Sequence, residues 1–222
     1  MRLSIALLAL AALARADSLE TILARMDASA KTFKSATATL TQTAYTAVVK
    51  ETFPPDTGAL TIKRNGANVS ALIVFGEPDA HTVVVKGHTA ELYHPKANEE
   101  EIYDLGKNAG LVDQFLLLAF GTSGAELQRH YNITAGGAEK IGDVATTRLD
   151  LTPMTGEVKK VITKIQLWIP DGKSNAIQEK VTEPSGNYDL AVYSNIKTNP
   201  NVPDSVFDLK LPKDVKKIYP QR

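Results

Sequence analysis

Four histidines are the side chains in this sequence best suited to proton transfer or metal binding near neutral pH: His81, His88, His94 and His130. If Gly87-His88 forms a two-residue hairpin turn, residues whose numbers sum to 175 face one another, and His81 and His94 become cross-strand neighbours. Two imidazoles can bind zinc, but a closed zinc site needs further ligands and none stands nearby in the sequence. We therefore expect a partly exposed histidine pair, no metal site and no cofactor.

Other signatures of catalysis are missing. The run Glu99-Glu100-Glu101 is typical of a solvated segment, because adjacent strand residues point to opposite faces of a sheet. The sequence has no Gly-x-Ser-x-Gly, phosphate-binding loop, Gly-x-Gly-x-x-Gly or His-Glu-x-x-His motif. It also has no cysteine, which excludes thiol nucleophiles, iron–sulfur clusters and disulfides. We expect no catalytic residues and no enzyme activity, and a metal-dependent enzyme using His81 and His94 is the minor alternative.

One charged residue follows an apolar strand pattern. Leu60, Ile62 and Arg64 share one face of the segment 58–64, while its other face is mixed. An arginine in phase with two aliphatic residues either reaches water at the end of the sheet or binds a polar group.

Composition gives no reason to expect nucleic acid as a partner. The chain has 222 residues, with 25 Lys and Arg against 25 Asp and Glu, and phosphate binding needs a basic surplus. The hydrophobic fraction of 43% is ordinary for a folded protein with a packed core.

Residues 1–16 have the layout of a secretory signal peptide. Met1-Arg2 is the positive region, Leu3 to Leu13 is apolar, and Ala14-Arg15-Ala16 is a cleavage site before Asp17. An exported chain without cysteine fits the bacterial periplasm, and without a lipobox cysteine it is not itself lipid-anchored. We expect a periplasmic protein, soluble after cleavage, with one domain over residues 17–222.

Periodicity then predicts the elements that must position these residues. Apolar residues at helical spacing predict a helix at 18–33, an apolar helix at 111–120 and a short one at 123–129, where Ser123 and Glu126 have capping-box spacing. Alternating residues between turn signals predict strands at 36–50, 58–64, 69–75, 80–86, 89–95, 99–104, 131–138, 144–152, 158–169, 174–183 and 186–197. A tail from Pro203 to Lys217 is irregular, with apolar anchors at Val206, Phe207, Leu209 and Leu211.

The predicted fold is α+β and mainly antiparallel β, with about eleven strands in a barrel, a sandwich or a curved open sheet. The segments 69–75 and 82–85 are apolar on both faces, so part of the sheet is covered on both sides. The helix at 111–120 is too apolar for a surface, and we expect it against the concave face as a plug or lid. Its residues Leu111, Phe115, Leu116 and Phe120 either yield to a ligand or are simply core.

Five short motifs follow the signal peptide. They are the helix ending in Phe33, the strand with Leu40-Thr41-Gln42, the segment Gly58-x-Leu60-x-x-Lys63-Arg64, the pair Val84-x-x-Gly87-x-x-x-x-Leu92-Tyr93-x-Pro95, and the tail Phe207-x-Leu209-x-Leu211-Pro212-x-x-Val215. Together they resemble the LolA-like family of periplasmic lipoprotein carriers over nearly the whole mature chain.

The resemblance implies an incomplete, open β-barrel with helices covering a hydrophobic cavity on the concave face. It also implies a chaperone that binds lipoprotein acyl chains, or a similar hydrophobic ligand, under a helical lid and delivers them toward the outer membrane. Its partners would be an inner-membrane ABC transporter and an outer-membrane receptor, and we expect a monomer. The family's functional arginine aligns with Arg64, where it contributes to holding the lid.

The predicted ligand-binding set combines the strand pattern with this resemblance. It comprises Leu60, Ile62, Arg64, Ile73, Phe75, Leu111, Phe115, Leu116 and Phe120. The segment after Arg64 departs from the family because it has no aromatic residue until Phe75. The stretch 131–153 looks closer to lipoprotein-sorting paralogues and to the lipid-binding modules of envelope-stress regulators. A lipid- or lipoprotein-sensing interaction module is therefore the alternative function.

Overall fold

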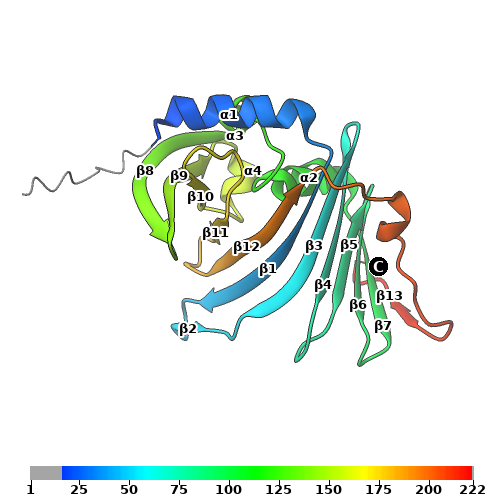
Figure 1. The fold of residues 1–222 in the computed structure, drawn as a ribbon. Coiled ribbons are helices and arrows are strands. Elements are labelled where there is room, and N and C mark those ends of the chain that lie inside the picture. Colours follow the sequence, from blue (N-terminus) through cyan, green and yellow to red (C-terminus); the bar gives the residue numbers. More distant parts are fainter. Residues whose placement is uncertain (1–16, 222) are drawn as a thin grey trace, which may run out of the picture.

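The computed structural model describes residues 17–221, so the expected signal peptide at 1–16 lies outside the described residues. The strands form one curved sheet that does not close, and the helices gather along one end of the strands (Figure 1). The strand order is β13-β7-β6-β5-β4-β3-β1-β12-β11-β10-β9-β8, with β2 paired to β1 off this path. The expectation of an α+β fold with an open half-barrel is confirmed.

Neighbouring strands are antiparallel except for β13, which pairs in parallel with β7. The strands are β1 (Ser35–Thr46), β2 (Glu51–Thr52), β3 (Asp56–Asn65), β4 (Asn68–Phe75), β5 (Thr82–Lys86), β6 (Thr89–His94), β7 (Glu99–Asp104), β8 (Tyr131–Ile141), β9 (Val144–Pro153), β10 (Lys164–Pro170), β11 (Gln178–Thr182), β12 (Tyr188–Thr198) and β13 (Lys216–Ile218). The helical elements are α1 (Leu19–Thr32), η1 (Gly106–Asn108), α2 (Ala109–Leu117), α3 (Gly124–His130), α4 (Gly156–Lys159) and η2 (Asp204–Phe207).

Five predictions about the elements need correction. The strand expected at 36–50 ends at Thr46, and the strand expected at 174–183 begins only at Gln178. Within residues 17–221 the sheet has thirteen strands instead of about eleven, because β2 and β13 are too short to show an alternating pattern. The strand expected at 158–169 begins only at Lys164, since the helical turn α4 occupies the preceding residues. The helix expected at 111–120 runs as α2 from Ala109 to Leu117 and is followed by tight turns.

The hairpin register expected for β5 and β6 is confirmed. Thr82 pairs with Tyr93 and Val83 with Leu92, so facing residue numbers sum to 175. Gly87 has a φ of 61°, a conformation that glycine adopts readily and most other residues avoid.

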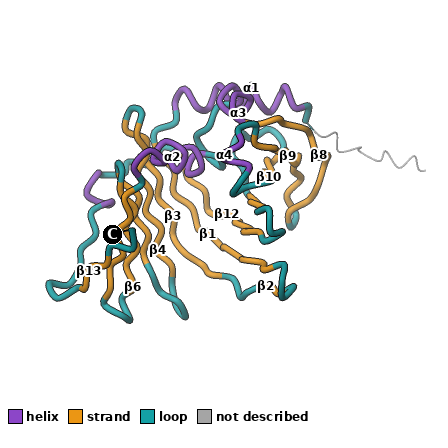
Figure 2. Tube along the Cα trace, turned by 180° about the vertical axis from the view of Figure 1, so that it is seen from behind, coloured by secondary structure: helices purple, strands orange, loops and turns teal. Residues whose placement is uncertain are grey.

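The concave face of the sheet forms the main core together with the helices. In α1, the Ser18 hydroxyl accepts from the Thr21 amide at 3.2 Å and caps the first turn, and Ile22, Leu23 and Met26 are buried. A Cβ on Gly124 would lie 2.7 Å from Leu23, so glycine allows α3 to pack closely on α1. Figure 2 shows α1 and α3 side by side at the same end of the sheet, with α2 across the strands.

The outer face of the sheet carries a second, smaller core. This agrees with the prediction that the sheet is covered on both sides at 69–75 and 82–85. Val202 and Phe207 of the C-terminal tail pack with Val84 of β5, and Leu72, Val206 and Leu209 lie against them. Lys63 of β3 donates to the Val202 carbonyl at 2.8 Å and to the Asp204 carboxylate at 2.7 Å. The tail therefore packs across the outer face of the sheet from β3 to β5.

None of the helices in residues 17–221 combines the length and the apolar character that crossing a membrane requires.

We predict that Phe207→Ala lowers the free energy of unfolding by roughly 3 kcal/mol, because it leaves a cavity under the tail. The Phe207 side chain is 2% exposed, whereas Phe53 is 46% exposed and serves as a matched control. Phe53→Ala should change stability by less than about 0.5 kcal/mol. Urea unfolding of both variants checks this, and equal small effects would show that the tail adds no core.

Candidate functional site

A cavity of about 290 Å³ lies between the concave face of the sheet and α2. Its apolar wall comes from inward-facing residues of β1, β3 and β4 and from one side of α2 and the turns after it. These residues are Leu40, Leu60, Ile62, Ile73, Val112, Phe115, Leu116 and Phe120. Strand alternation explains the sheet side, since Leu60 and Ile62 stand two apart on β3.

Helical spacing explains the other side of the cavity. Val112, Phe115 and Leu116 are three and four residues apart, which places them on one face of α2. Leu117 and Ala109 are buried in contact with the rest of the protein, while Val112, Phe115 and Leu116 are only partly buried. The aliphatic face of α2 thus covers the sheet without filling the space beneath it.

The opposite wall of the cavity is polar and comes from β11 and β12. Glu179 and Asp189 line it together with Gln42 of β1 and with Val181, Ala191 and Tyr193. Glu179 is 8% exposed, and one of its carboxylate oxygens accepts a hydrogen bond from the Tyr193 hydroxyl at 3.2 Å. The Phe120 ring meets the Tyr193 ring edge-on at 4.9 Å between centroids, so the tyrosine links the polar wall to the apolar one.

Burial raises the pKa of Glu179 to about 7, and the hydrogen bond from Tyr193 only partly opposes this. Burial raises the pKa of Tyr131 to about 12, with a smaller contribution from the Glu179 charge. Burial also raises the pKa of Tyr193, and the neighbouring Glu179 raises it further. Glu179 is therefore a carboxyl group that changes charge near neutral pH inside an apolar site.

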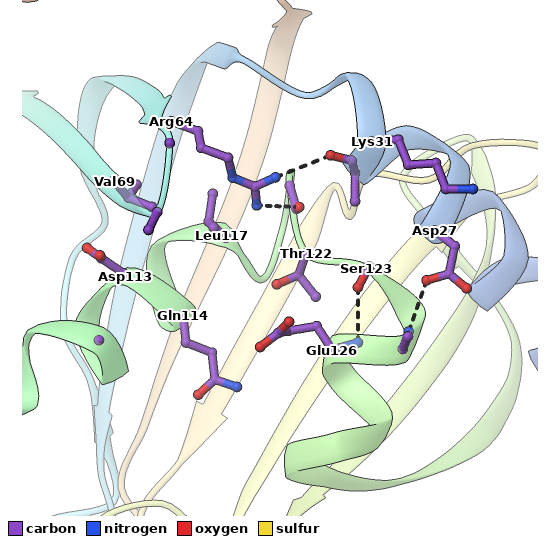
Figure 3. A pocket seen from close by; sticks show the side chains of 16 residues that line it. Asp27, Lys31, Arg64, Val69, Asp113, Gln114, Leu117, Thr122, Ser123 and Glu126 are labelled. Carbon is purple, nitrogen blue, oxygen red and sulfur yellow. Dashed lines mark hydrogen bonds between the residues drawn. The ribbon is translucent and has the colours of Figure 1, made fainter.

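Arg64 lies in a different, larger hollow of about 740 Å³ on the other side of α2 (Figure 3). Its guanidinium donates to the Ala30 carbonyl in α1 at 3.2 Å and to the Gly121 carbonyl at 2.8 Å. Its carbon atom Cζ lies 5.4 Å from the centroid of the Phe33 ring. Burial lowers the pKa of Arg64, with the nearby Glu126 opposing this. Arg64 ties the end of α1 to the segment after α2.

The two hollows differ in what they can bind. Most residues around the larger hollow are polar, charged or small, among them Asp27, Lys31, Asp113, Gln114 and Glu126. Most of the side chains that line the smaller cavity are aliphatic or aromatic. An apolar ligand fits the smaller cavity, because only there does binding remove much hydrocarbon surface from water.

Six of the nine residues predicted to bind a ligand line the apolar cavity: Leu60, Ile62, Ile73, Phe115, Leu116 and Phe120. Arg64 lines the polar hollow instead. Phe75 is buried and its ring stacks on His81 at 4.4 Å between centroids. Leu111 is on α2 but lies outside the cavity lining, because Val112, Phe115 and Leu116 form the face that meets the sheet.

The sequence-based prediction missed the polar wall. Glu179 and Val181 share a face of β11, as Asp189, Ala191 and Tyr193 do in β12. The sequence did contain a signal, because Glu179 alternates in step with an inward-facing apolar residue of the same strand. Placing Glu179 opposite α2, however, requires knowing that β12 pairs with β1.

His81 and His94 are neighbours, as the register predicted, with ring centroids 5.9 Å apart. In the part of the chain that the structure describes, no three His, Cys, Asp or Glu side chains are grouped so as to hold a metal ion.

We predict that ionisation of Glu179 costs the folded protein stability as the pH rises. The pKa of Glu179 rises from 4.5 to about 7 on folding. Stability is therefore highest below pH 4.5 for this group, falls as the pH rises to 7, and loses about 3 kcal/mol in all. Glu179→Gln should remove this loss, so that the variant gains about that much over the wild type at pH 8 relative to pH 4.5.

Urea unfolding at both pH values measures the difference. Glu157→Gln is the control, because the Glu157 side chain is 87% exposed and should leave the pH dependence unchanged. The same pH dependence in Glu179→Gln and in the wild type would contradict the prediction.

Comparison with known proteins supports the location and the fold. Residues 115–219 match a family described as "Predicted periplasmic protein (DUF2092)", in agreement with the periplasmic location expected from the sequence. No curated protein matches the chain significantly.

Solved structures with a similar fold come from several proteins. An uncharacterised conserved protein from Thermus thermophilus is 11% identical, with a TM-score of 0.53, over 91% of this chain and 99% of that one. MucB is 11% identical, with a TM-score of 0.50, over 86% of this chain and 62% of its own. A LolA superfamily protein from Nitrosomonas europaea is 14% identical over 86% and 98%, with a TM-score of 0.39. At these low identities, the Thermus thermophilus protein and MucB show a similarity of fold with this chain and nothing further.

Proposed function

We propose that this protein binds acyl chains in the cavity under α2 and carries lipoproteins, or a similar hydrophobic cargo, through the periplasm toward the outer membrane. The cavity of about 290 Å³ between the sheet and α2 is the observation that carries the proposal. The resemblance of its sequence motifs to the LolA-like family supports it. The proposal requires no chemical step, and an inner-membrane ABC transporter and an outer-membrane receptor are the partners that the family resemblance suggests.

The energetics of such a carrier depend on exchanging one apolar contact for another. Each Å² of hydrocarbon removed from water contributes roughly 25 cal/mol, so a partly buried acyl chain gains several kcal/mol. Val112, Phe115 and Leu116 face the sheet without filling the cavity. They shield the concave face when it is empty and contact the chain when it is loaded, which avoids a large exposed apolar patch.

The size of the cavity indicates that α2 moves when cargo binds. A volume of about 290 Å³ is about ten times the share of one water molecule in the liquid. That is room for part of one acyl chain. A longer or branched cargo needs α2 to move away from the sheet.

Arg64 is placed to resist this movement. It binds the Gly121 carbonyl just beyond α2 and the Ala30 carbonyl of α1, so displacement of α2 breaks at least one charge-assisted hydrogen bond. A Cβ on Gly121 would lie 2.6 Å from the Phe33 ring, which keeps this carbonyl close to the end of α1. We assign Arg64 the role of a latch on the lid and not of a contact to cargo.

An interaction module that senses mislocalised lipoproteins is the second candidate. The likeness of fold to MucB motivates it, and MucB has also been solved in a complex with MucA from Pseudomonas aeruginosa. The strand β8 ends the sheet order and could accept a partner strand. A pull-down that recovers a stable regulatory partner, together with no lipoprotein release in a transfer assay, would favour this candidate.

The carrier proposal predicts lipid in the purified protein and sensitivity of binding to the inner face of α2. Native mass spectrometry of protein from the periplasm should detect bound lipid. Leu116→Gln should weaken binding of a fluorescent hydrophobic dye roughly tenfold, because it places an amide in the cavity. Leu111→Gln is the matched control on the same helix, and its binding should stay within about twofold. Absence of lipid together with equal dye binding by both variants would contradict the proposal.

The latch predicts faster exchange without loss of the fold. Arg64→Leu removes two hydrogen bonds from a charged group, each worth about 1.5 kcal/mol, and should speed dye release at least about tenfold. Lys63→Leu, on the opposite face of β3, is the control and should leave release unchanged. Stopped-flow dye release and circular dichroism provide the two readouts, and equal release rates in all three proteins would refute the latch.

A further inference from the structure

The charged side chains that line the apolar cavity are both acidic. Glu179 and Asp189 are the charged residues of its lining, and no lysine, arginine or histidine of the described residues is among them. Asp189 is exposed, whereas Glu179 is 8% exposed, so the acidic wall extends from the surface to a buried carboxyl group.

Sheet register makes this wall a defined feature and not a chance cluster. Glu179 pairs with Ala191, and Ala191 pairs with Gln42 on the next strand. Val181 pairs with Asp189 on the adjacent row. The polar side chains of Gln42, Glu179 and Asp189 therefore lie at neighbouring positions of β1, β11 and β12. The apolar wall, with Leu60 and Ile62, begins on β3.

The buried carboxylate has capacity for another donor. In residues 17–221, the Tyr193 hydroxyl is the side chain that donates to Glu179, and it occupies one of the two oxygens. A carboxylate accepts through both oxygens, so a donor from a ligand in the cavity can satisfy the second. A cation would also offset the cost of keeping this charge away from water.

We propose that the cavity selects amphiphiles whose head group is a cationic amine, with the alkyl chain under α2 and the ammonium group against Glu179 and Asp189. This inference rests on the proposed function, because it assumes that the cavity binds an alkyl chain. A carboxylate head group placed at the same wall meets two like charges and leaves them unpaired, so fatty acids are disfavoured.

A series of ligands with one chain and three head groups tests the selection. Decylamine, decanol and decanoate are titrated into the full mature protein by isothermal calorimetry at pH 8, where Glu179 is mostly ionised. Decylamine should bind at least tenfold more tightly than decanol, and decanoate at least tenfold more weakly than decylamine. In Glu179→Gln the preference of decylamine over decanol should fall below about threefold, while the affinity for decanol stays within about threefold of the wild type.

Glu91→Gln is the control, because Glu91 is a partly buried carboxyl on β6 outside the cavity lining. It should keep the full preference for the amine. Equal binding of decanol, decanoate and decylamine would overturn the selection and leave the carrier proposal standing. Retention of the amine preference in Glu179→Gln would also overturn it. Failure of all three ligands to bind would overturn both the carrier proposal and the selection.

Discussion

The whole molecule depends on how an open sheet buries its concave face. A closed barrel hides its inner residues from water, whereas an open sheet needs other elements to cover them. Here the helices lie along one end of the strands, and the cover is uneven (Figure 2). Toward β8, β9 and β10 the inner residues Leu149, Leu151, Ile165 and Leu167 are fully buried. Under α2 the packing leaves a cavity, so the concave face is closely packed toward β8 and forms the candidate site under α2.

This division explains why α2 differs from α1. The buried face of α1 carries Ile22, Leu23 and Met26, and α3 packs closely against it through Gly124. In α2, the face toward the sheet is only partly buried, and Arg64 supplies a polar connection beyond its end. A hydrogen bond to a carbonyl breaks and reforms without rearranging a core, whereas the interlocked side chains of α1 and α3 resist movement. A mobile lid is therefore more easily built from α2 than from α1.

Sequence patterns predicted the local structure well and the long-range structure poorly. The sequence placed the ends of β3, β4, β6, β7 and β9 within two residues, because turn signals bound each of these strands. It could not find β13, since three residues paired in parallel with β7 have no local signature. In the site, the aliphatic residues of β3 and α2 followed from periodicity. The place of Glu179 in the cavity did not follow from periodicity. It depends on the pairing of β1 with β12, two strands that are far apart in the sequence.

The pairing of β1 with β12 also affects when the cavity can form during folding. β1 spans Ser35–Thr46 and its partner β12 spans Tyr188–Thr198, so about 150 residues separate two strands that lie in the middle of the sheet. Hairpins such as β3–β4 and β5–β6 form from neighbouring residues, but contacts between distant residues form slowly, since a long loop must close first. The aliphatic and the acidic walls of the cavity thus belong to two separate segments until β12 docks on β1. A ligand site that depends on this long-range pairing is present only in molecules in which β12 has paired with β1.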